Sequence, residues 1–117
     1  MEFKNLEDEN IYIIDYSGFI TYDKGISNMD YLETKLKELS LKNNRLNIIF
    51  DVQNTQWESI EIHNDLSRIA RKIFNSQNLN CDLYTAILNK EINDSTIDNE
   101  HWFIRKQDAI EWLRSVQ

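Results

Sequence analysis

A serine, a histidine and an aspartate lie close together in the sequence, and these are the residue types of a hydrolytic triad. They are Ser59, His63 and Asp65. All three fall within one predicted helical segment, and residues two positions apart point to different sides of a helix. Because His63 and Asp65 would not pair there, the sequence predicts no hydrolase, and we expect a protein that is not an enzyme.

Side chains that bind metals or phosphates are scarce. Only His63, His101 and Cys81 offer nitrogen or sulfur ligands, whereas a zinc site needs three or four ligands at regular spacing. The chain has no proline and only two glycines, so it lacks the glycine-rich loops that cradle phosphates. We therefore predict no metal and no cofactor.

The charge balance limits the class of partner. The 117 residues include 13 Lys and Arg against 20 Asp and Glu, which gives a formal net charge of −7. An acidic chain is a poor ligand for nucleic acids and for anionic membranes. The chain has no apolar run of membrane-spanning length and an acidic start instead of a signal peptide. We expect a cytoplasmic protein with one domain, residues 1–117.

A short apolar run, LNIIFDVQNT at residues 46–55, predicts the strand around which any site must be built. Leu46, Ile48 and Phe50 alternate with Ile49, as in a strand that is buried on both faces. In open α/β sheets, ligands and regulatory groups collect beyond the carboxyl ends of such strands. Residues 51–59 are therefore where we expect function.

The remaining periodicities predict strands that alternate with helices. The expected elements are a hairpin of 1–6 and 11–16, a helix from Ile26 to about Leu41 with Ser27 in its capping box, a second helix that starts between Thr55 and Ser59 and ends before Asn78, a strand at 81–88, at most a turn of helix in 89–100, a strand at 102–104 and a helix at 107–116. The order is ββαβαβ(α)βα. It predicts an α/β fold with a mostly parallel sheet, an N-terminal hairpin and covering helices.

Three short motifs resemble the STAS/SpoIIAA-like family, also called STAS/Sec14-like. They are Gly18, Ile20 and Thr21 before a helix, Phe50-Asp51-Val52 at the end of the central strand, and a terminal aromatic strand followed by Ala109, Trp112 and Leu113. The resemblance implies a SpoIIAA-like single domain from a bacterium that regulates or binds another protein and catalyses no reaction.

The resemblance also implies a phosphorylation switch. In regulatory STAS domains, the loop after the central strand carries Asp-Ser, and a kinase and a phosphatase act on the serine. Glu58-Ser59 falls at about this position, with Glu in place of Asp, so Asp51, Thr55, Glu58 and Ser59 would form a partner-binding loop. The residues themselves also allow a structural interpretation, in which Ser59 caps a helix and Asp51 accepts backbone hydrogen bonds.

A second function follows from the Sec14-like side of the resemblance. Trp57, Phe74, Tyr84 and Trp102 would converge beside the strand ends and form the pocket of a carrier or sensor of a small apolar ligand or lipid. Such pockets are mostly apolar with a few polar groups, which Asp51, Thr55 and Tyr84 would supply. Alternatively, Trp57 and Trp102 only seal the core.

Overall fold

The strand Arg45–Asp51 (β4) lies at the centre of a five-stranded sheet with the order β1-β2-β4-β6-β7 in this computed structural model. It pairs in parallel with β2 on one side and β6 on the other. Leu46, Ile48 and Phe50 are buried in one apolar cluster, and Ile49 is buried in another on the opposite face. The predicted central strand and its alternation are therefore confirmed.

The structure describes residues 1–6, 10–75, 79, 81–92 and 99–116. Its elements are β1 (Glu2–Leu6), β2 (Ile11–Asp15), β3 (Gly18–Ile20), α1 (Tyr22–Ser40), β4 (Arg45–Asp51), β5 (Thr55–Trp57), α2 (Ile60–Ile73), β6 (Asp82–Leu88), β7 (Glu100–Phe103) and α3 (Lys106–Ser115). Strand β1 runs antiparallel to β2, and the other pairs of the sheet are parallel. The predicted α/β class, the hairpin and the mostly parallel sheet are confirmed.

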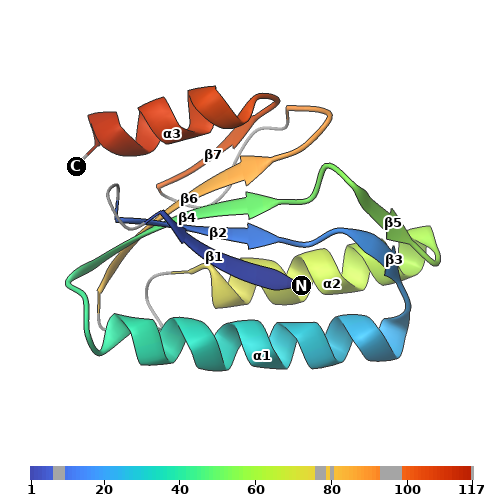
Figure 1. The fold of residues 1–117 in the computed structure, drawn as a ribbon. Helices are drawn as coiled ribbons and strands as arrows, with labels where there is room; N and C mark the ends of the chain where they lie inside the picture. Colours follow the sequence, from blue (N-terminus) through green and yellow to red (C-terminus); the bar gives the residue numbers. More distant parts are fainter. Residues whose placement is uncertain (7–9, 76–78, 80, 93–98, 117) are drawn as a thin grey trace.

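The helices form two layers, one on each face of the sheet (Figure 1). Helices α1 and α2 cover the face that carries Leu46, Ile48 and Phe50, and α3 covers the face that carries Ile49. Neighbouring positions of each strand therefore face different layers.

Two short strands were not predicted, so the order ββαβαβ(α)βα is incomplete. Strands β3 and β5 pair in parallel with each other and form a separate two-stranded sheet. Gly18 starts β3 at a φ of +99°, a left-handed conformation that other residues adopt only with strain. The stretch 89–100 was predicted to contain at most a turn of helix, and its residues 93–98 lie outside the described residues.

The start of the first helix was predicted four residues too late. Helix α1 begins at Tyr22, after Thr21 whose Oγ1 accepts a hydrogen bond from the Lys24 backbone N–H at 3.3 Å. Ser27 is consequently a mid-helix residue and caps nothing. The misleading signals were the apolar stripe that starts at Ile26 and the capping-box pattern at Ser27, whereas Gly25 is helical although glycine disfavours helices.

Candidate functional site

The loop after β4 is held by two side chains of the predicted site. Asp51 Oδ1 accepts a hydrogen bond from the Gln53 backbone N–H at 3.0 Å. Thr55 Oγ1 donates a hydrogen bond to the carbonyl oxygen of Tyr16, and this ties β5 to the end of β2. The interpretation of Asp51 as an acceptor of backbone hydrogen bonds is therefore confirmed, whereas Thr55 acts as a donor to the backbone of a neighbouring segment.

Ser59 is the N-cap of α2. Its backbone is extended, with φ −153° and ψ 164°, and its Oγ accepts a hydrogen bond from the Ile62 backbone N–H at 3.2 Å. The capping interpretation is confirmed, while Thr55, the other predicted start of this helix, belongs to β5. Ser59 is exposed, and Glu58 beside it is exposed as well. A phosphate on Ser59 stays a prediction.

A cavity of about 650 Å³ lies between α2 and the carboxyl-terminal halves of β4, β6 and β7. Three of the four predicted pocket residues line it, namely Trp57, Phe74 and Trp102, and Thr55 lines it too. Asp51, Glu58 and Ser59 are not among the lining residues. The sheet supplies Phe50 from β4, Ile87 from β6 and Trp102 from β7.

The register of the sheet explains why these side chains share one face. Ile87 of β6 pairs with Trp102 of β7, and Thr85 pairs with Glu100 in the same way. Paired residues of neighbouring strands project to the same side. Trp102 and Glu100 are therefore brought to the face covered by α2, although β7 is only four residues long.

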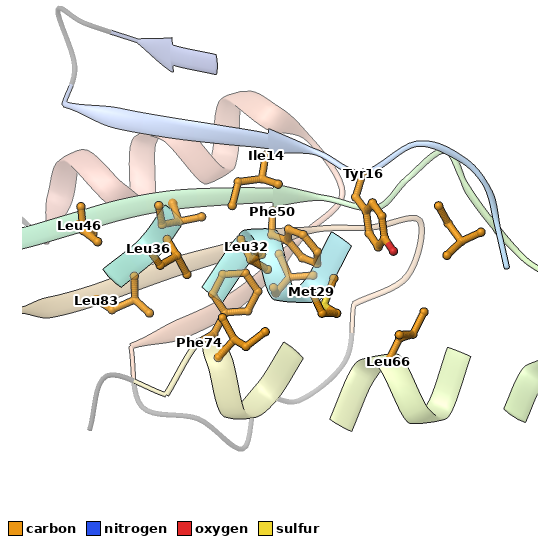
Figure 2. Close-up of a cluster of buried hydrophobic side chains, with 14 residues drawn as sticks. Ile14, Tyr16, Met29, Leu32, Leu36, Leu46, Phe50, Leu66, Phe74 and Leu83 are labelled. Atoms are coloured by element: carbon orange, nitrogen blue, oxygen red, sulfur yellow. The ribbon is translucent and has the colours of Figure 1, made fainter. Parts of the chain in front are cut away.

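Aromatic side chains form the inner end of the cavity. Figure 2 shows Phe50 and Phe74 facing each other between the sheet and α2, with ring centroids 5.1 Å apart. Tyr16 contacts both Phe50 and Trp57, each at 5.9 Å between ring centroids. Burial raises the pKa of the Tyr16 hydroxyl, and a hydrogen bond from Asn28 partly lowers it. This hydroxyl is therefore a neutral polar group at the cavity wall at neutral pH.

Tyr84 was assigned to the pocket wrongly. It lies on β6 between Leu83 and Thr85, so its side chain projects to the opposite face, toward α3. There its ring centroid lies 3.7 Å from Arg45 Cζ and 6.3 Å from the ring of Trp112. Tyr84 therefore packs between the sheet and α3.

Ser59, His63 and Asp65, the residue types of a hydrolytic triad, each make contacts outside such a triad. The ring of His63 lies 5.0 Å from that of Trp57, and Asp65 accepts a hydrogen bond from Arg68 at 3.1 Å. Ser59 Oγ accepts the capping hydrogen bond. Within the described residues, no group of three or more His, Cys, Asp and Glu could hold a metal ion.

Polar and charged residues of the cavity were missed by the sequence analysis. They include Asn64, Ser67, Arg68 and Arg71 of α2, Lys90 after β6, and Glu100 of β7. The four residues of α2 recur at spacings of three and four beside its apolar stripe, so a helical projection identifies them as one edge of the helix. No local sequence pattern predicts that Lys90 and Glu100 line the cavity, because the pairing of β6 with β7 determines where they lie.

The chain matches no known family model and no curated protein. The resemblance to the STAS/SpoIIAA-like family therefore stays a prediction. Within the part of the chain that the structure describes, no helix has the length and apolarity needed to cross a membrane.

Proposed function

We propose that this protein is a non-enzymatic domain that binds a small, largely apolar ligand between α2 and the sheet, as a carrier or sensor. The observation that carries the proposal is the cavity of about 650 Å³ lined by Trp57, Phe74 and Trp102. Its volume lies within the roughly 300–1,000 Å³ of pockets that bury small organic ligands. Trp57 and Trp102 also pack against the buried core, so the cavity adds a binding surface to rings that seal the core.

The position of the cavity supports the same function. It lies at the carboxyl ends of parallel strands, where open α/β sheets bind ligands. Its walls combine aromatic rings with polar and charged side chains, so the site can hold an apolar body and fix a polar group. The other contacts of Ser59, His63 and Asp65 support a protein without hydrolytic activity. We expect the protein to act in the cytoplasm.

Tryptophan fluorescence provides a direct test. The chain has three tryptophans, and two of them, Trp57 and Trp102, line the cavity. The third, Trp112, lies on α3 and packs against the opposite face of the sheet. In a Trp112→Phe variant, all tryptophan emission therefore comes from the cavity. Titration with decan-1-ol should shift this emission saturably, and native mass spectrometry of freshly purified protein should detect any ligand retained from the host.

A cavity-filling variant separates binding in the cavity from binding elsewhere. Ala70 lies on α2 at the cavity wall, and Ala70→Phe should weaken decan-1-ol binding at least about tenfold. Glu38→Phe places the same ring on the exposed surface of α1 and serves as the matched control. Equal affinity of the Ala70→Phe variant and the control would refute the cavity as the binding site.

A second candidate function, binding of a regulatory protein partner at Ser59, rests on a different observation. Ser59 lies in a shallow surface depression with Trp57, Ile60 and His63, and the Ile60 side chain is 71% exposed. An exposed apolar residue next to a modifiable serine is suited to a contact that a phosphate would block. Trp57 and His63 also line the large cavity, so the two surfaces are contiguous.

A further inference from the structure

One residue that lines the cavity, Trp102, carries a hydrogen-bond donor without a partner. The indole Nε1 of Trp102 is buried, and an indole N–H can only donate a hydrogen bond. Among the described residues, it has no hydrogen-bond partner. A buried donor without a partner carries a desolvation cost, and a ligand oxygen that accepted this hydrogen bond would remove that cost.

The charges around the cavity differ from those of the chain as a whole. The described residues that line it include three basic side chains, Arg68, Arg71 and Lys90, and two acidic ones, Glu91 and Glu100, whereas the chain has 20 acidic and 13 basic residues. Arg68 is paired with Asp65, so Arg71 and Lys90 balance the two acidic side chains, and the lining lacks the net negative charge of the whole chain. Local relief of the negative charge of an acidic protein makes this the place where a negatively charged ligand is least repelled.

Two of the three basic groups are available. Arg68 pairs with Asp65 at 3.1 Å, but Arg71 and Lys90 form no ion pair with the described residues through their side chains. They approach the cavity from two elements, since Arg71 lies on α2 and Lys90 follows β6. Glu100 is 9% exposed and has an interaction partner of its own, so it is not an open site for a cationic group.

From these donors and charges we infer that the ligand is an amphipathic anion, an apolar body that carries one carboxylate or similar oxyanion. This inference rests on the proposed function. The apolar body packs against Phe50, Phe74 and Trp57, and the anion pairs with Arg71 and Lys90. Arg71 and Lys90 are exposed, so they lie where the cavity opens to solvent, and charge-assisted hydrogen bonds to them are stronger than neutral ones.

Three probes with the same ten-carbon chain and different head groups test the class of ligand. Decanoate, decan-1-ol and decyltrimethylammonium are titrated into the Trp112→Phe variant. Decanoate should bind at least about tenfold more tightly than the other two. Its affinity should fall as salt is raised, because part of the attraction is screened, while that of decan-1-ol should not.

Single substitutions identify the groups that select the anion. Arg71→Gln and Lys90→Gln should each weaken decanoate binding about tenfold and leave decan-1-ol binding unchanged. Lys106→Gln removes the same charge from α3, on the other face of the sheet, and should leave both affinities unchanged. Trp102→Phe keeps an aromatic ring, removes the unpartnered N–H, and should weaken decanoate binding several-fold.

The outcomes distinguish the two proposals. Equal binding of the three probes, with no effect of Arg71→Gln and Lys90→Gln, would overturn the anionic class and leave a cavity that binds apolar ligands. If none of the probes binds, and native mass spectrometry finds no retained ligand, the proposed function fails together with the inference. Preference for decyltrimethylammonium would reverse the sign of the inferred charge.

Discussion

Gly25 of α1 packs directly against Leu66 of α2. A Cβ atom at position 25 would lie 2.3 Å from Leu66 Cδ1 and 2.9 Å from Cδ2, so only glycine fits without displacement of the Leu66 side chain. Leu66 is fully buried, and it also lines the cavity. Because Gly25 has no Cβ, α2 can approach α1 closely at this point. The resulting position of α2 defines one wall of the cavity.

Gly25→Ala should therefore destabilise the protein although alanine is the better helix former. The gain in helix propensity is about 1 kcal/mol, and overpacking of a buried contact costs about 1–3 kcal/mol. We expect a net loss of about 1 kcal/mol in the free energy of unfolding, measured by urea denaturation. Leu66→Ala would relieve the clash, so the double variant should be more stable than the sum of the two single effects predicts. Additive effects would show that the two side chains do not compete for space.

Ser59 should contribute to stability as a helix cap. Ser59→Ala removes the acceptor of the Ile62 N–H and should cost about 1 kcal/mol. Ser27→Ala, on the exposed part of α1, changes the same side chain without a cap and should be neutral or slightly stabilising. Equal stabilities of the two variants in urea would contradict the capping role.

Ser59→Asp tests the switch separately from the cap. Aspartate also caps helices, and its charge is favourable at a helix N-terminus, so stability should stay within about 1 kcal/mol of the parent. Binding to a protein partner recovered from an extract of the native cells should become weaker, because Glu58 and Glu61 already make this surface acidic. Unchanged partner binding, or phosphorylation mapped to another residue, would leave Ser59 as a cap only.

Tyr84 should affect α3 and not the ligand. Tyr84→Ala removes the ring that contacts Arg45 and Trp112 and should destabilise the protein by about 2 kcal/mol. The affinity for decan-1-ol should remain that of the parent, since the side chain is on the other face of the sheet. Isothermal titration at a temperature where both variants are folded checks this, and a tenfold loss of affinity would contradict the assigned face.

Tyr16 should make stability fall at high pH. Burial raises the pKa of its hydroxyl in the folded state above the ordinary value of 10.0, against a smaller lowering by Asn28. The unfolded state then loses its proton first, so the stabilising contribution is complete below pH 10 and declines as the pH rises through 10 toward the folded pKa. Tyr16→Phe should flatten this decline in urea denaturation across the alkaline range. Tyr31→Phe, at a side chain that is 53% exposed, should leave the decline unchanged.

Much of the framework could be predicted from the sequence because it is encoded in local periodicity. The alternation of Leu46, Ile48 and Phe50 with Ile49 predicts a strand buried on both faces, and the spacing of Ile62, Leu66 and Ile69 predicts α2. Trp57, Phe74 and Trp102 were expected to converge beside the strand ends, and they line one cavity. These predictions need only the residue types and the direction of parallel strands.

Tertiary structure decided the features that depend on contacts between distant residues. Strands β3 and β5 are three residues each, too short for a period, and they form because Gly18 and Thr55 are brought together. Gly25 has a low helix propensity, yet it lies inside α1 and leaves space for Leu66, which is 41 positions away. Tyr84 faces α3 because the register of β6 assigns alternate side chains to opposite faces, and a shift of one position reverses this choice.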